Sequence, residues 1–361
     1  MSTIPDYLNW RGDLRFNTDP VNEVDVYILS KIGCPDYTGI VSADAESVLL
    51  SEAVHSFFAR YGQEERLFGV LASRSLGPVL QRLTETERYK DLKLCAFVNK
   101  LKEKTTEQFS ALSIMLPDGT VCVTFRGTDD TLLGWKENLM MSVLDTIPAQ
   151  SDALEYLRRV ASFFPGPLMV AGHSKGGNLA VYASSMVEQE IQERITAVFN
   201  YDGPGFRAHF FQNPGYSAVF PKIRTYLPQY SIVGMMLPRT ERVQIVRSSR
   251  AGTAAHDGFQ WEVLGPRFLR CEEFSRSTQA FEESLQTVLQ NMDHESRIAF
   301  IDELFDTLAS TGAETIADVT ELHTRKALSL SREIYRKPEV HKFVINLIEL
   351  MLRDFASSRR D

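Results

Sequence analysis

Short apolar runs bounded by turn residues alternate with stretches of helical periodicity through the middle of the chain. Residues 111–116 and 120–125 flank the turn Pro117-Asp118-Gly119 and together predict a β-hairpin. Other strand-like runs lie at 167–171, 195–200 and 243–247. Helix-like stretches separate these runs, and this alternation is typical of an α/β protein with a mostly parallel central sheet and helices on both faces.

Helical periodicity dominates both ends of the chain. Residues 1–100 are predicted to be mainly helical, with a further element at Leu92–Val98. Four C-terminal helices are predicted at 281–291, 298–308, 316–335 and 340–355. We therefore expect a single domain over residues 1–361, made of an N-terminal helical region (1–100), a sheet core (101–275) and C-terminal helices (276–361).

The segment Gly172-His173-Ser174-Lys175-Gly176 joins the strand-like run 167–171 to a helix-like run at 177–183. A serine on a sharp strand-to-helix turn projects its hydroxyl from the sheet, and flanking glycines let the backbone turn without Cβ clashes. The pattern predicts a nucleophile elbow with Ser174 as the nucleophile. A glycine-rich turn whose serine merely caps the helix is the alternative.

A serine nucleophile needs a histidine base and a carboxylate that orients the base, in the chain order Ser, acid, His for this kind of turn. Asp202 follows the predicted strand 195–200 and is the candidate acid. His256 follows the run 243–247 and is the candidate base. His173 is expected to point away from the nucleophile and to pack, and Trp261 to pack beneath the histidine loop.

An acyl-transfer site also needs N–H donors for the oxyanion. The backbone N–H of Lys175, directly after the nucleophile, is one candidate, and that of Thr128, in the loop after the hairpin, is the other. Trp135, Met235 and Met236 lie near these loops and are candidate walls of a substrate pocket, since methionine adapts to an acyl chain. At helical spacing, such residues also fit a role in the core.

The run Val123-Thr124-Phe125-Arg126-Gly127-Thr128, with Trp135 and the elbow, resembles the class 3 (fungal-type) lipases over about residues 110–265. The segments 6–13, 22–25, 174–178 and 201–206 more closely resemble a bacterial family, the Mbeg1-like or DUF2974 proteins, over most of residues 3–275. These resemblances imply an α/β-hydrolase fold and a serine hydrolase that acts on an ester or thioester with a lipid-like acyl group.

One position departs from the class 3 lipase pattern. These lipases carry their acid in a segment that corresponds to Tyr230-Ser231-Ile232-Val233-Gly234, and Ser231 stands at the place of the carboxylate. With Asp202 as the acid, the placement resembles the pancreatic lipase group instead. Loss of the acid from a triad lowers the rate by several powers of ten. The alternative function is therefore a weak or inactive hydrolase-fold scaffold that binds a lipid or protein partner.

The composition excludes several other classes. With 361 residues, 43% of them hydrophobic, the chain can bury a large core. The formal charge of −8, from 39 basic and 47 acidic residues, argues against a nucleic-acid surface. The sequence contains no phosphate-loop, dinucleotide or zinc signature, so no cofactor or metal is expected.

The cysteines are scattered and give no disulfide framework; they are Cys34, Cys95, Cys122 and Cys271. Residues 1–20 lack the apolar core of a signal peptide, and the sequence has no unbroken apolar stretch of about 18 residues. We expect a cytoplasmic protein without a transmembrane segment. A lipid-like substrate would bring it into transient contact with a membrane surface, and the sequence leaves the oligomeric state open.

Overall fold

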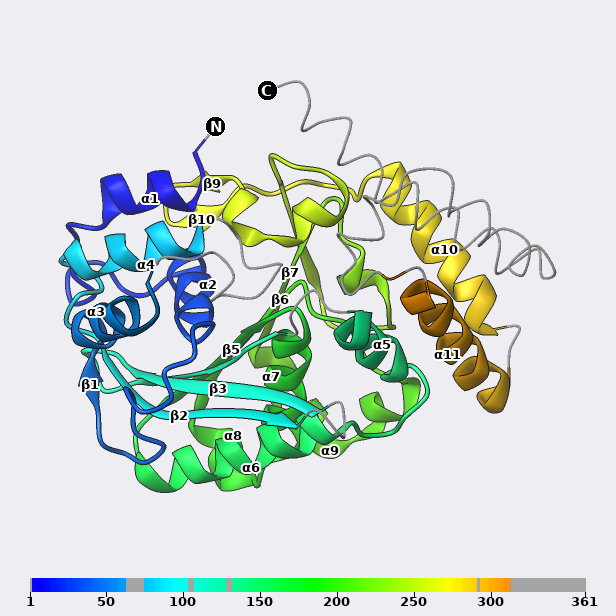
Figure 1. Cartoon of the computed structure of the whole chain (residues 1–361), viewed down its shortest axis with the longest axis horizontal. Helices are drawn as coiled ribbons and strands as arrows, with labels where there is room; N and C mark the ends of the chain where they lie inside the picture. Colours follow the sequence, from blue (N-terminus) through cyan, green and yellow to red (C-terminus); the bar gives the residue numbers. More distant parts are fainter. Residues whose placement is uncertain are drawn as a thin grey trace.

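A sheet whose strands follow the order of the chain lies at the centre of the protein (Figure 1). The computed structural model describes residues 2–62, 75–102, 107–127, 132–290, 293–310 and 312. Within these residues the sheet has eight strands: β1 (Val48–Leu49), β2 (Lys93–Lys102), β3 (Glu107–Met115), β4 (Val121–Phe125), β5 (Leu168–His173), β6 (Ile195–Tyr201), β7 (Ile223–Pro228) and β8 (Val243–Val246). Neighbours from β1 to β4 are antiparallel, and neighbours from β4 to β8 are parallel. The predicted fold class is confirmed.

The predicted hairpin consists of β3 and β4, with Gly119 at φ +85° in the turn, a left-handed conformation that glycine adopts without a Cβ clash. The N-terminal region, expected to be mainly helical, also supplies β1 and most of β2. The run Leu92–Val98 thus contributes to a strand. A short, continuous apolar run fits a buried strand as well as a helix, so periodicity alone does not separate the two.

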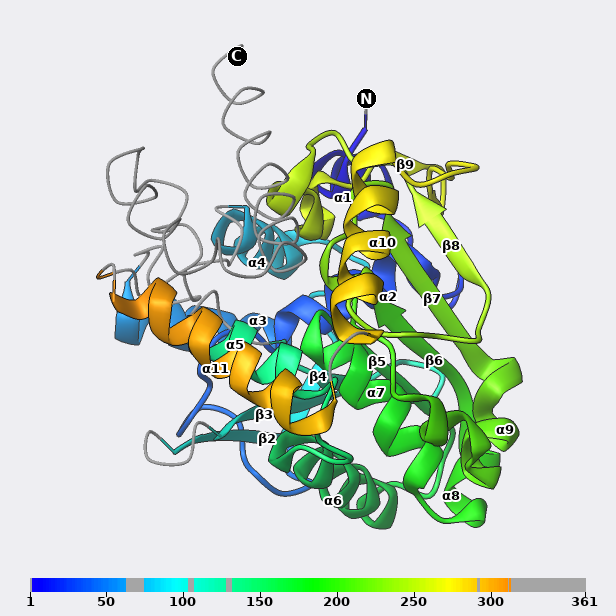
Figure 2. The same ribbon diagram turned by 90° about the vertical axis from the view of Figure 1, so that its right-hand side faces the viewer.

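Helices cover both faces of the sheet (Figures 1 and 2). One face carries α1 (Ile4–Arg11), α2 (Glu23–Ile32), α3 (Leu50–Tyr61) and α4 (Leu76–Glu85), and the other carries α6 (Pro148–Phe163), α7 (Lys175–Met186), α8 (Gln189–Arg194) and α9 (Pro214–Val219). Successive side chains of a strand point to opposite faces. In β5, Met169 and Ala171 accordingly join the core under α2, whereas Leu168 and Val170 join the core under α7.

A further apolar cluster lies beyond the sheet, where α5 (Leu132–Met140) meets α10 (Arg276–Gln290) and α11 (His294–Ser310). α11 lies beside α5 (Figure 2), and Lys136 Nζ on α5 is 2.7 Å from the Asp302 carboxylate on α11. These helices match the first two predicted C-terminal helices. The predictions for 316–335 and 340–355 fall outside the described residues. Among the described helices, none has the length and apolar character that a membrane crossing requires.

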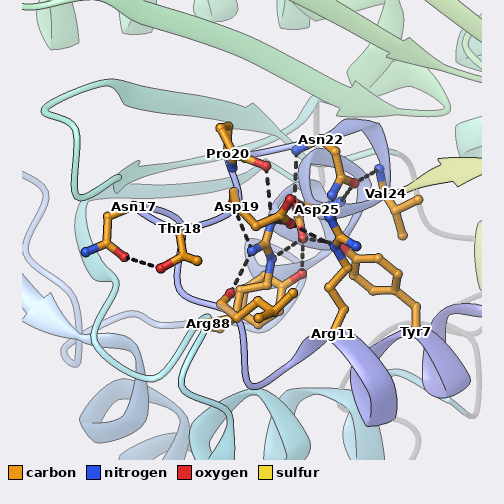
Figure 3. A network of polar contacts seen from close by, with 12 residues as sticks. Tyr7, Arg11, Asn17, Thr18, Asp19, Pro20, Asn22, Val24, Asp25 and Arg88 are labelled. Atoms are coloured by element: carbon orange, nitrogen blue, oxygen red, sulfur yellow. Dashed lines mark hydrogen bonds and ion pairs between the residues drawn. The ribbon is translucent and has the colours of Figure 1, made fainter. Parts of the chain in front are cut away.

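A buried polar network ties α2 to α1 and to the segment that follows α4 (Figure 3). The side chains of Asp25 and Arg88 are fully buried, and Arg88 Nη2 and Nε donate to the two Asp25 carboxylate oxygens at 2.6 and 2.8 Å. The hydroxyls of Tyr7 and Tyr89 donate to the same carboxylate at 2.7 and 2.5 Å. Burial, followed by the charge of Asp25, raises the pKa of Tyr7, so this hydroxyl remains a donor.

Asp25→Ala is expected to lower the free energy of unfolding by about 3–5 kcal/mol, because it removes the buried counter-charge of Arg88 and leaves only the partly exposed Asp19 carboxylate, 3.3 Å from Arg88 Nη2. Asp13→Ala is the matched control, since Asp13 is exposed and its loss should change the same quantity by about 0.5 kcal/mol or less. Urea unfolding followed by circular dichroism measures both. Equal midpoints for the two variants would show that the network does not anchor α2.

Candidate active site

The elbow predicted from the sequence connects β5 directly to α7. Ser174 sits between them with φ +58°, a left-handed conformation that is strained for a residue other than glycine. A Cβ on Gly172 would lie 2.1 Å from the backbone of Gly176, and one on Gly176 would lie 2.1 Å from the carbonyl oxygen of Phe125. Only glycine fits at either position, so the sequence pattern reflects the tight approach of helix and strand.

The candidate acid and base meet at the carboxyl edge of the sheet. Asp202 directly follows β6, is fully buried and has φ +49°. Its backbone N–H donates to the carbonyl of Tyr226 at 2.8 Å, which ties the turn to β7. His256 ends the 3₁₀ helix η6 (Gly252–His256), and its Nδ1 lies 2.6 Å from Asp202 Oδ2. The carboxylate can only accept, so Nδ1 carries the hydrogen and Nε2 is left as the basic nitrogen.

Ser231, which stands where class 3 lipases carry their acid, touches the other oxygen of the same carboxylate. Its hydroxyl donates to Asp202 Oδ1 at 2.5 Å and accepts from the N–H of Gly234 at 3.1 Å. Parallel strands β6 and β7 are neighbours, so the loops that follow them emerge side by side. The two positions are alternatives on sequence alone, whereas the structure brings them into one hydrogen-bonded pair.

Arg239 joins the two loops behind this pair, a role that the sequence analysis missed. Its guanidinium donates to the carbonyl of Gly203, after Asp202, at 3.0 Å and to the carbonyl of Gly234. Burial lowers the pKa of Arg239, and the charges of Glu241 and Asp202 oppose that shift. No local pattern marks this arginine, because its partners are carbonyl oxygens on loops that follow two different strands.

The candidate nucleophile Ser174 and the candidate base His256 are not joined by a described hydrogen bond. Both residues are described, and no hydrogen bond between Ser174 Oγ and His256 Nε2 occurs among the described contacts. His173 also contacts His256: the centroids of the two rings lie 4.4 Å apart. Trp261 packs as expected, because its indole N–H donates to the carbonyl of Ala255 in the histidine loop at 2.8 Å. The contact of His173 with His256 was not foreseen.

Of the two candidate oxyanion donors, the structure describes Lys175. Lys175 is the first residue of α7, where backbone N–H groups point out of the helix end. Its ammonium is buried and lies 2.6 Å from Glu137 on α5, a contact the sequence did not predict. Gly127 approaches the elbow so closely that a Cβ there would lie 3.0 Å from Ser174 Cβ. Thr128, the next residue, lies outside the described residues.

The candidate pocket residues lie on two elements. Met235 ends the 3₁₀ helix η5 (Val233–Met235), and both Met235 and Met236 are buried in the cluster formed with α5, α10 and α11. Trp135 belongs to α5, but its side chain is outside the description. Their contact with a substrate stays a prediction. In the described part of the chain, no group of three or more His, Cys, Asp or Glu residues is placed to hold a metal ion.

The mostly parallel sheet, the helices on both of its faces and the sharp turn from β5 through Ser174 into α7 together define an α/β-hydrolase fold. The Mbeg1-like family model matches residues 83–306, more than half of the chain, and the chain belongs to this family. This confirms the resemblance seen in the sequence, although the matched range begins and ends later than 3–275. Helices α1 to α3 thus precede the matched range.

Among solved structures, the chain is similar to three lipases. It is 16% identical to M37 lipase (52% of this chain, 68% of that one, TM-score 0.36) and 14% identical to the Rhizomucor miehei lipase propeptide complex (62% and 67%, TM-score 0.37). It is 13% identical to a triacylglycerol lipase from Penicillium expansum (52% and 77%, TM-score 0.35). No curated protein matches the chain.

Proposed function

We propose that this protein is a serine hydrolase that cleaves an ester or thioester, with a lipid-like acyl group preferred. The observation that carries the proposal is the 2.6 Å contact between Asp202 Oδ2 and His256 Nδ1, made at the sheet edge where Ser174 occupies a strained elbow. Backbone strain at a polar residue is characteristic of functional sites.

In the proposed mechanism, Ser174 Oγ attacks the carbonyl carbon of the substrate while His256 Nε2 takes the hydroxyl proton. The resulting oxyanion receives hydrogen bonds from the backbone N–H groups of Lys175 and Thr128. His256 then gives its proton to the leaving alcohol or thiol, and the C–O or C–S bond breaks to leave an acyl-serine. Water then gives a proton to His256 and attacks the acyl carbon. The bond to Ser174 Oγ breaks, the carboxylic acid is released, and His256 returns the proton to Ser174 Oγ.

Asp202 holds the Nδ1–H tautomer throughout this cycle and stabilises the imidazolium that forms transiently. Ser231 and Arg239 keep its carboxylate in place, since they bond to the free oxygen and to the adjoining backbone. Met235, Met236 and Trp135 are proposed to border the acyl group. The four cysteines are free, and on that ground we propose a reducing compartment, the cytoplasm.

A hydrolase-fold scaffold that binds a lipid or protein partner is the second candidate. The observation in its favour is that Ser174 Oγ and His256 Nε2, both described, share no hydrogen bond. A hydrogen bond between nucleophile and base often forms only when substrate binds, so the lack of this bond is also compatible with a hydrolase. An assay of serine reactivity separates the two.

A fluorophosphonate probe is expected to label the native protein at Ser174, because only an activated serine attacks the probe. His256→Gln should slow labelling by about 100-fold or more, since general-base catalysis contributes roughly 10²–10⁴-fold. His209→Gln, at an exposed histidine paired with Asp145, is the matched control and should label like the wild type. Labelling rates are measured by in-gel fluorescence. A folded wild-type protein that does not react would contradict the hydrolase and support the scaffold.

A further inference from the structure

Side chains from β5 and α2 form hydrogen bonds to the backbone of the loop that carries His256. His173 Nε2 lies 2.7 Å from the carbonyl oxygen of His256. Two residues further along, the N–H of Gly258 donates to the hydroxyl of Tyr27 at 2.9 Å. With the Trp261 bond described above, these contacts bind the backbone on both sides of the base. The position of the imidazole therefore depends on His173 and Tyr27 as well as on Asp202.

The partners of His173 determine which of its nitrogens carries the hydrogen. A carbonyl oxygen only accepts, so Nε2 must be the N–H that bonds to His256. The other nitrogen, Nδ1, lies 3.4 Å from the ammonium of Lys31, a group that only donates. Both contacts require the same neutral tautomer, with hydrogen on Nε2 and a lone pair on Nδ1. Both contacts are lost if His173 takes the other tautomer, and protonation of His173 sets Nδ1–H against the Lys31 ammonium.

The surroundings of His173 favour its neutral form. Burial lowers the pKa of His173 well below its usual range, and the charge of Lys31 and the proximity of His256 lower it further. Lys31 and Tyr27 of α2 face His173, and the ring centroids of Tyr27 and His173 are 5.6 Å apart. His256 faces His173 from the other loop, and Asp202 contacts His256 in turn. A neutral His173 leaves the 4.4 Å stacking contact free of repulsion when His256 becomes an imidazolium.

We propose that His173 is a positioning residue for the base His256 and that Lys31 of α2 fixes the tautomer through which it acts. The activity part of this inference rests on the proposed function. α2 is suited to the task because it is rigidly held: Asp25 binds Arg88, and the hydroxyl of Tyr201 in β6 donates to the Glu23 carbonyl at 2.6 Å. The N-terminal segment that precedes the family match therefore completes the site.

Two substitutions at position 173 separate positioning from packing. His173→Phe keeps a stacked ring of similar size and removes both hydrogen bonds, whereas His173→Gln retains an N–H donor near the Nε2 position. We expect kcat on a p-nitrophenyl ester to fall by about 10–100-fold in His173→Phe with KM unchanged, because small misplacements of a catalytic group cost about that much. His173→Gln should stay within about threefold of the wild type, which a purely structural role would not predict.

Lys31→Met tests the tautomer and the pH dependence. Burial, the largest cause of the lowered pKa of His173, remains in this variant, but removing the ammonium takes away the next largest cause and raises that pKa. His173 then becomes cationic at a higher pH, and kcat/KM is lost at a higher pH than in the wild type. We expect the acid limb to move toward neutral pH and kcat at pH 7 to fall by about tenfold or less. Lys100→Met removes a lysine paired with Asp152 of α6, on the sheet face opposite α2, and is the matched control; it should leave the profile unchanged.

Nitrogen NMR of histidine-labelled protein supplies a readout that does not require turnover. We expect His173 to be neutral with hydrogen on Nε2 at pH 7 in the wild type and in Lys100→Met, and to show mixed tautomers in Lys31→Met. The proton between His256 Nδ1 and Asp202 should be retained in His173→Gln and broadened in His173→Phe. A wild-type His173 that carries hydrogen on Nδ1, or is cationic at pH 7, would overturn the inference even in an active enzyme. If the expected NMR result appears without ester turnover, the proposed function fails and the positioning contact stands.

Discussion

Ser174→Ala is expected to abolish ester cleavage and fluorophosphonate labelling, because the proposed mechanism has no other nucleophile. In well-studied triads this change lowers kcat by about a millionfold, and a slower enzyme has less to lose. Hydrolysis of short p-nitrophenyl esters measures the loss. Alanine has the same Cβ as serine, so the backbone strain at φ +58° is unchanged and folding should be retained.

Ser185→Ala is the matched control for this experiment. Ser185 lies on the same helix, α7, and its hydroxyl donates only to the Val181 carbonyl at 2.8 Å, so its loss should leave activity near the wild-type value. Circular dichroism checks that both variants fold. Turnover that persists in Ser174→Ala would remove Ser174 from the mechanism and leave the elbow as a helix cap.

Backbone strain in this protein coincides with the candidate site. Among the described residues other than glycine, positive φ occurs at Ala96, Ser174 and Asp202, and two of these are the proposed nucleophile and acid. Each such residue costs about 1–3 kcal/mol and persists only where the surroundings enforce it. For Ser174 the surroundings are the tightly packed glycines of the elbow; for Asp202 they are its hydrogen bonds to Tyr226, Ser231 and His256.

The parts of the site that the sequence predicted are those set by local chain geometry. The elbow is encoded by glycines within two residues of Ser174, and Asp202 and His256 are identifiable as candidates because each follows a strand-like run. The hairpin was likewise marked by its own turn. In each case the residues that determine the structure lie next to one another in the chain, so a pattern in one short segment was sufficient.

The contacts that the sequence did not predict join distant segments. Lys31 and His173 are 142 residues apart, and nothing local to either residue indicates the other. On sequence alone, Ser231 and Asp202 lie in two separate loops that compete as the place of the acid. The pairing of β6 with β7 puts these loops side by side and lets the two side chains bond to each other. Asp25, within the motif at 22–25, is buried against Arg88, 63 residues further along the chain, and neither segment by itself indicates this contact.

Asp202→Asn is expected to preserve folding and to lower kcat by about 10³–10⁴-fold, because an amide favours the wrong imidazole tautomer and cannot stabilise the imidazolium. Ser231→Ala removes one hydrogen bond to the same carboxylate and should lower kcat by about tenfold or less, in line with the roughly 1.5 kcal/mol of such a bond. The two losses, measured in one esterase assay with circular dichroism as the folding check, rank the two positions directly. Asp202→Asn with a loss of less than about tenfold would move the acid away from Asp202.

Ser231→Asp further tests which of the two positions carries the acid, because it places a carboxylate at the class 3 lipase position. In the wild-type background it should lower activity, since two carboxylates within hydrogen-bond distance repel each other and one of them takes up a proton. In the Asp202→Asn background the repulsion is gone, and the new carboxylate lies beside the loop that holds His256, so part of the lost kcat should return. A gain of activity in the single Ser231→Asp variant would contradict this account, because it would mean that the acid belongs after β7 and that Asp202 only supports it.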